Sequence, residues 1–224
     1  MIVKARVLPL LCLFAVALAA PLLAAAQDEF PVPPGTAPTI DGTIASGEWE
    51  DAASIELDED STLYLKYAND CLFLAVRGTT MGIPSPMIVR GEDVVVLHAS
   101  AALGTAVYTR HGDAWVQTQS FVWRCRDRGF GEAAVAEREA FFEQEGWLGT
   151  IGYLGARTES EVQVLLDGPT LRMLLLYMEA TRPAKVLSWP APPEETAHYL
   201  PLITGPIPTE IDIDFDQWAI LRFE

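Results

Sequence analysis

The chain has 224 residues, of which half are hydrophobic, and its 31 acidic and 15 basic residues give a formal net charge of −16. A surface of that sign repels phosphate backbones and anionic lipid headgroups, so nucleic acid and membrane-surface partners are disfavoured. The length suits one domain with a full hydrophobic core.

Residues 1–26 have the features of a secretory signal peptide. Lys4 and Arg6 precede an apolar run over 7–23, and the three alanines at 24–26 offer a small-residue cleavage site. Two prolines in the apolar run favour removal of this segment over a stable membrane span. We therefore expect an exported protein, periplasmic or at the cell surface, with no membrane insertion after the leader is cleaved.

Residues 27–37 contain three prolines and are predicted to form an extended lead-in. No linker, repeat or low-complexity tract interrupts the chain after this segment. Residues 38–224 are therefore predicted to form a single domain.

Two cysteines, Cys71 and Cys125, follow the leader, and an exported protein can form disulfides. A bond between them would stabilise the fold by about 4 kcal/mol in the chain-entropy model. Because spacing in the sequence does not give the distance between their Cα atoms, two free and buried thiols are an equally open alternative.

The next elements are predicted to be strands. A short strand at 54–57 is followed by a hairpin of Thr62–Ala68 and Cys71–Arg77 around a tight Asn69-Asp70 turn. Alternating apolar residues give each hairpin strand one apolar face: Leu63, Leu65 and Tyr67 on the first, and Leu72, Leu74 and Val76 on the second.

The apolar run in Asp93–Ala99 suits a strand buried on both sides, and 104–110 with 114–123 predict a second hairpin across 111–113. Alanines and glutamates in Glu132–Glu145, with Val135, Phe141 and Phe142, indicate an amphipathic helix.

Strands are expected again at 161–166 and 171–179, followed by a proline loop at 190–193 and a closing strand over 211–223. Many short strands separated by turn residues predict an all-β fold, an antiparallel β-sandwich with one or two short helices.

The start of the predicted domain carries a distinct motif. Ile40 is expected to anchor the first strand in the core, and Asp41-Gly42 to form a turn. A short helix capped by Ser46 would place Trp49 over one end of the core, a structural role.

This motif, together with Tyr67-Ala68-Asn69-Asp70 and the strand that follows, resembles the opening of family 9 carbohydrate-binding modules. The resemblance implies a jelly-roll-like β-sandwich of the group called DOMON-like, extending over residues 38–223. It also implies non-catalytic binding of saccharide through aromatic rings, since the C–H faces of a pyranose stack on flat apolar surfaces.

Three tryptophans are the candidate sugar platforms. Trp147 follows Gly146 in a loop-like setting, Trp189 lies beside the proline loop, and Trp115 begins a strand face of rings and amides. The amides on that face are Gln117 and Gln119, followed by the rings of Phe121 and Trp123. Filling of the core is the alternative role for any of these tryptophans.

Asp212, Asp214 and Asp216 would lie on one face of the closing strand. Carboxylate oxygens suit calcium, so calcium is one cofactor to consider, with an ordinary solvated acidic face as the alternative.

No sequence motif of a nucleophile elbow, phosphate loop, dinucleotide site or zinc protease is present, so we expect no enzyme activity. The alternative functions are a haem b-binding electron-transfer subunit, which the DOMON-like resemblance allows, and an interaction domain with an unidentified protein partner. Haem ligands would come from the histidines or from these residues: Met81, Met87, Met173, Met178, Lys66 and Lys185.

Overall fold

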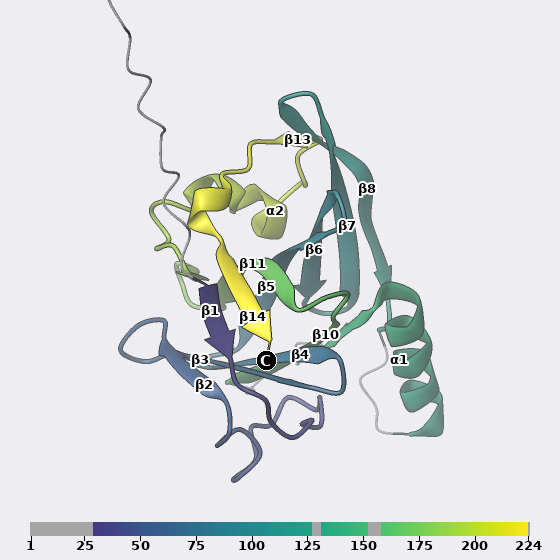
Figure 1. Ribbon diagram of the computed structural model, residues 1–224, viewed down its shortest axis with the longest axis vertical. Coiled ribbons are helices and arrows are strands. Elements are labelled where there is room, and N and C mark those ends of the chain that lie inside the picture. The colour runs from purple at the N-terminus through teal and green to yellow at the C-terminus, as the bar shows by residue number, and fades with distance from the viewer. Residues whose placement is uncertain (1–28, 127–130, 152–157, 224) are drawn as a thin grey trace, which may run out of the picture.

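The computed structural model describes residues 29–126, 131–151 and 158–223, which form a sandwich of two β-sheets with two short α-helices (Figure 1). The fold is all-β, as predicted. The predicted signal peptide, residues 1–26, lies outside the described residues. Within the described ranges, no helix combines the length and apolar character needed to cross a membrane.

The larger sheet has nine strands, and its main path runs β1-β14-β11-β5-β6-β7-β8-β13, with β12 also paired to β11. All of its strand pairs are antiparallel except β1 with β14. In chain order the strands are β1 Glu29–Val32, β5 Gly82–Arg90, β6 Asp93–Ala99, β7 Leu103–His111, β8 Ala114–Arg124, β11 Thr170–Glu179, β12 Lys185–Trp189, β13 Glu210–Ile211 and β14 Ala219–Phe223.

The smaller sheet has five antiparallel strands in the order β2-β3-β4-β10-β9. They are β2 Ala53–Glu56, β3 Thr62–Ala68, β4 Cys71–Arg77, β9 Trp147–Gly149 and β10 Glu159–Leu165. The helical segments are α1 Glu132–Glu145, η1 Ala197–Tyr199, α2 Pro201–Thr204 and η2 Phe215–Gln217.

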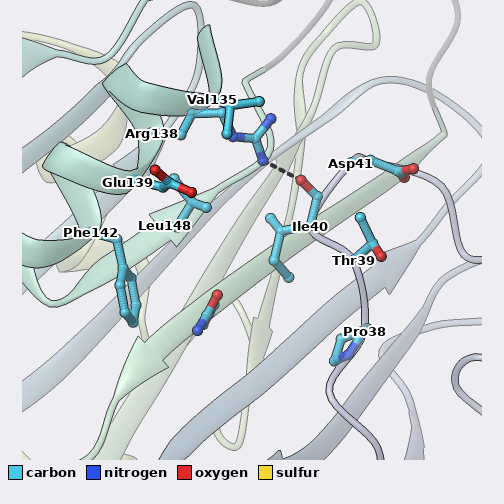
Figure 2. A pocket seen from close by; sticks show the side chains of 10 residues that line it. Pro38, Thr39, Ile40, Asp41, Val135, Arg138, Glu139, Phe142 and Leu148 are labelled. Atoms are coloured by element: carbon cyan, nitrogen blue, oxygen red, sulfur yellow. Dashed lines mark hydrogen bonds between the residues drawn. The ribbon is translucent and has the colours of Figure 1, made fainter. Parts of the chain in front are cut away.

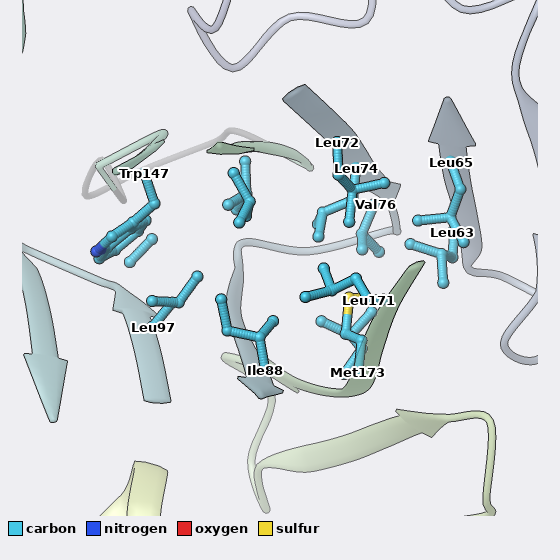
Figure 3. Packing of buried hydrophobic residues seen from close by; sticks show 14 of the residues in the cluster. Leu63, Leu65, Leu72, Leu74, Val76, Ile88, Leu97, Trp147, Leu171 and Met173 are labelled. Atoms are coloured by element: carbon cyan, nitrogen blue, oxygen red, sulfur yellow. The ribbon is translucent and has the colours of Figure 1, made fainter. Parts of the chain in front are cut away.

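The main core lies between the facing sheets. Figure 3 shows side chains from β3 and β4 pointing toward side chains from β5, β6 and β11. Leu171 is almost fully buried. The other residues that the figure labels have no exposed surface: Leu63, Leu65, Leu72, Leu74, Val76, Ile88, Leu97, Trp147 and Met173. Burial of this apolar surface is the main favourable contribution to folding.

The outer face of the nine-stranded sheet is covered by the segment from η1 to η2 (Figure 1). Tyr199 from this segment and Trp218, which directly follows it, are fully buried against Tyr108 and its neighbours on the sheet. The Tyr199 hydroxyl accepts hydrogen bonds from Trp218 Nε1 at 3.3 Å and from the Asp214 N–H at 3.0 Å. These bonds hold the covering segment together across its length.

The first predicted hairpin is confirmed as β3 and β4. Asn69 and Asp70 have φ values of 49° and 58°, the left-handed conformation that a tight two-residue hairpin turn requires. The second hairpin, β7 and β8, and the helix Glu132–Glu145 are also confirmed.

The lead-in is part of the sandwich. Glu29–Val32 forms β1, parallel to β14, and Val32 is buried in the main core. Tyr67 of β3 then donates its N–H to Pro33 O at 3.0 Å and accepts from the Gly35 N–H at 2.9 Å. The chain therefore passes from one sheet to the other before residue 38.

Strand β5 is not among the strands expected from the sequence, and it contains Pro84 and Pro86, residues that are unusual in a central strand. Both prolines lie opposite β11, whereas pairing with β6 begins only at Met87. The missing N–H groups therefore fall where β5 has no partner on its second side.

The predicted closing strand over 211–223 was wrong in its extent. The chain forms the short β13, then η2, then β14. Asp214 precedes η2, and its Oδ1 accepts the Asp216 N–H at 3.0 Å. This local cap bends the backbone out of the extended form.

Of the two alternatives that the sequence left open for the cysteines, the structure shows the second: no disulfide joins Cys71 and Cys125, and both thiols are buried. Cys71 faces outward from the five-stranded sheet, whereas Cys125 lies in the main core between the sheets. The Cys71 thiol accepts a hydrogen bond from Gln163 Nε2 at 3.3 Å, and burial raises its pKa.

Replacing Trp147 by alanine should lower the free energy of unfolding by about 3–5 kcal/mol, because a fully buried ring leaves a cavity. Trp123→Ala is the matched control, since that ring is 39% exposed and its loss should cost about 1 kcal/mol. Urea denaturation followed by circular dichroism measures both. Equal losses in the two variants would contradict this assignment of the core.

Candidate functional site

The predicted platform at Trp147 was wrong, because that indole has no exposed surface. Gly146, at φ 67°, ends α1 by donating its N–H to Phe142 O at 2.8 Å, and the next residue enters β9. The Trp147 ring packs edge-on against Phe141 at 5.3 Å, and its Nε1 donates to Thr105 Oγ1 at 2.9 Å. A glycine that suggested a loop in the sequence is instead a helix C-cap that turns the chain into the core.

Trp115 was also wrongly predicted as a platform, since it is buried against Phe215, with the ring centroids 5.7 Å apart. Trp189 is half-buried and packs edge-on against Phe30 of β1 at 5.3 Å. Both rings therefore help to attach covering or edge segments to the nine-stranded sheet.

The predicted alternation from Trp115 through Gln117 and Gln119 is broken by two register shifts between β7 and β8. Gln117 is opposite Tyr108, whose side chain is on the outer face, but Gln119 is opposite Val107, the next residue along β7. Residues opposite each other share a face of a sheet, so the two glutamines lie on different faces. An amide pair beside one ring does not form.

The three aspartates expected to bind calcium are all exposed, but they do not lie along a strand. Asp214 instead caps η2, as described above, and Asp212 precedes it in an irregular segment. Among the described residues, no group of three or more His, Cys, Asp or Glu side chains is arranged to hold a metal ion.

Four of the residues considered as haem ligands are engaged in packing or ion pairs. Met87 and Met173 are fully buried in clusters on opposite faces of the nine-stranded sheet. Lys66 donates to Asp51 Oδ1 at 2.9 Å and to the Glu48 carbonyl, and Lys185 pairs with Asp58.

The opening motif is held by a fully buried carboxylate that sequence reasoning missed. Glu161 of β10 accepts the N–H groups of Asp41 and Gly42 at 3.0 and 2.6 Å, and Trp49 Nε1 donates to it at 3.2 Å. Burial is the largest influence on this carboxyl and raises its pKa to about 7, while the three donors oppose the shift.

Trp49 covers the outer face of the five-stranded sheet, not an end of the main core. It packs with Ile40, Ile44 and Phe73, and the expected helix around it is a series of turns. Its predicted structural role is retained. The Glu161 carboxylate accepts three hydrogen bonds from the opening motif, so we interpret Glu161 and Trp49 as a structural anchor for that motif.

A cleft of about 350 Å³ lies between α1 and the opening motif (Figure 2). Its walls include Ile40, Val135, Phe142 and Leu148, and Arg138 reaches from α1 to donate to the Ile40 carbonyl. The cleft is mainly apolar. Phe142, the aromatic side chain that lines it, is half-buried.

An aromatic pair made of an exposed ring and a half-buried ring lies elsewhere, at the end of β8. The rings of Phe121 and Trp123 are stacked, with centroids 5.1 Å apart and planes at 25°. His98 of β6 contacts both rings, at 5.6 and 5.5 Å. Its Nδ1 is 2.8 Å from Ser85 Oγ, and burial lowers the pKa of the imidazole to about 4, so the ring is neutral at pH 7.

Gly104 of β7, directly opposite Trp123, makes room for the indole. A Cβ atom there would lie 2.8 Å from Trp123 Cε3, so the ring lies against bare backbone. Contacts with Gly104, Phe121 and His98 therefore fix the orientation of a ring that is still 39% exposed. We call these four residues the Trp123 platform.

A hollow of about 220 Å³ adjoins the Trp123 platform. It is lined by Ser100, Ala101, Ala102, Trp123 and Arg126. The hollow thus brings together the oriented ring of Trp123, the hydroxyl-bearing residue Ser100 and the arginine Arg126. Phe121 and Trp123 were noted in the sequence as part of the Trp115 strand face, but no local signal showed that Trp123 would remain exposed while Trp115 would be buried.

No protein-family model matches this chain, and no curated protein matches it. Among solved structures, it is similar to a protein from Bacteroides uniformis ATCC 8492 described as a "putative carbohydrate-binding protein". The TM-score is 0.41 at 9% identity, over 77% of this chain and 85% of the other. A likeness of this degree defines neither a family nor a ligand for this chain.

The buried Glu161 should make stability depend on pH in a defined direction. Its pKa of about 7 in the folded protein lies above the ordinary value of 4.5, so between these values the folded state binds the proton more tightly than the unfolded chain. The unfolding free energy should therefore fall as the pH rises from 4.5 to 7, by about 3 kcal/mol from this group.

The measurement is urea denaturation of the wild type and Glu161→Gln across this range. His98 has the opposite effect, because its lowered pKa makes stability rise as pH increases from about 4 to 6.5. Both proteins keep His98, so their difference isolates Glu161. A difference that stays constant with pH would contradict the assignment.

Proposed function

We propose that this protein is an exported, non-catalytic β-sandwich that binds saccharide by stacking a sugar ring on Trp123. The observation that carries the proposal is an indole that is 39% exposed and yet held in one orientation from several sides. A ring whose orientation is already fixed loses little conformational entropy when a ligand binds to it, which favours stacking.

The geometry supports a sugar better than a purely apolar ligand. One exposed ring provides a flat surface for the C–H face of a pyranose, and the adjoining hollow is lined by Ser100 and Arg126, whose side chains can form hydrogen bonds to the polar groups of a sugar. A few polar groups around an aromatic surface are the usual composition of a site that selects orientation.

The lining of the hollow also supports binding without hydrolysis. Glycosidases place two carboxyl groups on opposite sides of the bond that is cleaved. The described lining residues contribute a ring, a serine, a guanidinium and two alanines. These groups can hold a sugar, and they do not form an acid and base pair.

Trp123→Ala should reduce the affinity for a bound polysaccharide at least tenfold, because the stacking surface is removed. Affinity gel electrophoresis against a panel of neutral and acidic plant, algal and bacterial polysaccharides identifies the ligand, and isothermal titration calorimetry measures the loss. Val122→Ala is the matched control, since Val122 is the adjacent residue on β8 and is 48% exposed. Wild-type affinity in Trp123→Ala, or no binding to any member of the panel, would overturn the proposal.

A further inference from the structure

The end of β8 is locally basic in a strongly acidic protein. The chain has a net charge of −16, yet Arg124 and Arg126 follow Trp123 within three residues. Arg124 is paired, with its Nη1 2.7 Å from Glu145 Oε1 of α1. Arg126 is exposed and lines the hollow beside Trp123.

A break in strand alternation brings Arg126 to the same hollow as Trp123. On a regular strand, residues 123 and 126 would point to opposite faces. Cys125 has φ 47° and buries its side chain in the main core, so the backbone turns sharply between the two. The left-handed conformation is uncommon for a residue other than glycine, and here it redirects the chain beside the platform.

The backbone at this turn is held from two sides. Leu103 donates its N–H to Cys125 O at 3.4 Å, and the Arg126 N–H donates to Glu137 Oε1 of α1 at 2.9 Å. The Glu137 carboxylate thus accepts from the main chain of Arg126. The position at which the arginine side chain leaves the backbone is therefore determined by both a strand and a helix.

We infer that the ligand is an acidic saccharide containing uronic acid, whose pyranose ring stacks on Trp123 while its carboxylate binds the Arg126 guanidinium. This inference rests on the proposed function and names the class of sugar. A guanidinium presents parallel N–H donors that match the two oxygens of a carboxylate, and such charge-assisted pairs are about twice as strong as neutral hydrogen bonds. Ser100, on the same hollow, is placed to contact a hydroxyl group.

The chain's overall charge makes this pairing selective. The general repulsion between an acidic protein and an acidic glycan opposes binding anywhere else on the surface. Attraction is then confined to a site where a cation and an oriented ring coincide, so a neutral analogue should lose most of the affinity that Arg126 provides.

The test uses two pairs of ligands in which esterification removes the negative charge at the cost of one added methyl group per residue: trigalacturonate and trimannuronate, each compared with its methyl ester, in calorimetric titrations at low salt. The wild type should bind at least one acid tenfold or more tightly than its ester. Arg126→Gln should lower the affinity for that acid to that of the ester and leave the ester unchanged. Arg124→Gln is the matched control, because it removes the same charge from a residue that does not line the hollow.

The possible failures separate the two proposals. Equal affinity for acid and ester, equal effects of the two arginine variants, or preference for a sulfated trisaccharide over both uronates would overturn the inference and leave saccharide binding intact. Trp123→Ala should abolish binding of acid and ester together. If it does not, or if the wild type binds no saccharide, the proposed function itself fails.

Discussion

The structure depends on the alternation of side chains along β-strands that are buried on both faces. In β4 all residues from Cys71 to Val76 are buried, three facing the main core and three facing outward. The outward face therefore requires a cover, and the opening motif supplies it with Trp49. The turns of the opening motif do not themselves provide acceptors for all of its buried N–H groups. Burying an N–H group without a hydrogen bond costs free energy, and the apolar side chains of the sheet offer no acceptor. Glu161, on the same outer face of the neighbouring strand β10, accepts three of these donors and so makes the cover compatible with burial.

The same requirement determines where the nine-stranded sheet stays open. Its outer face is covered by the segment from η1 to η2 over Tyr108 and Trp115. Farther along β8, Phe121 and Trp123 return to this face after the two register shifts, beside Gly104 and His98. The exposed ring is therefore a consequence of where the covering segment ends. Its fixed orientation follows from the neighbouring strands, which are rigid elements of the core.

Much of the fold was predictable because the relevant signals are local. The Asn69-Asp70 turn, the alternating leucines of β3 and β4, and the composition of α1 each act over a few residues. The misses involve distant partners. Pro84 and Pro86 are tolerated in β5 because β6 does not pair beside them, and β1 forms because β14, almost two hundred residues away, lies alongside it.

The sequence by itself determined the class of fold, the main hairpins and the helix, because strand alternation and left-handed turn residues are properties of short segments. The tertiary structure decided which tryptophan is exposed. Gly146 turns Trp147 into the core, Phe215 covers Trp115, and nothing comparable covers the exposed part of Trp123 among the described residues. Exposure depends on which segments pack together after folding, and that information is not contained in the neighbours of a residue along the chain.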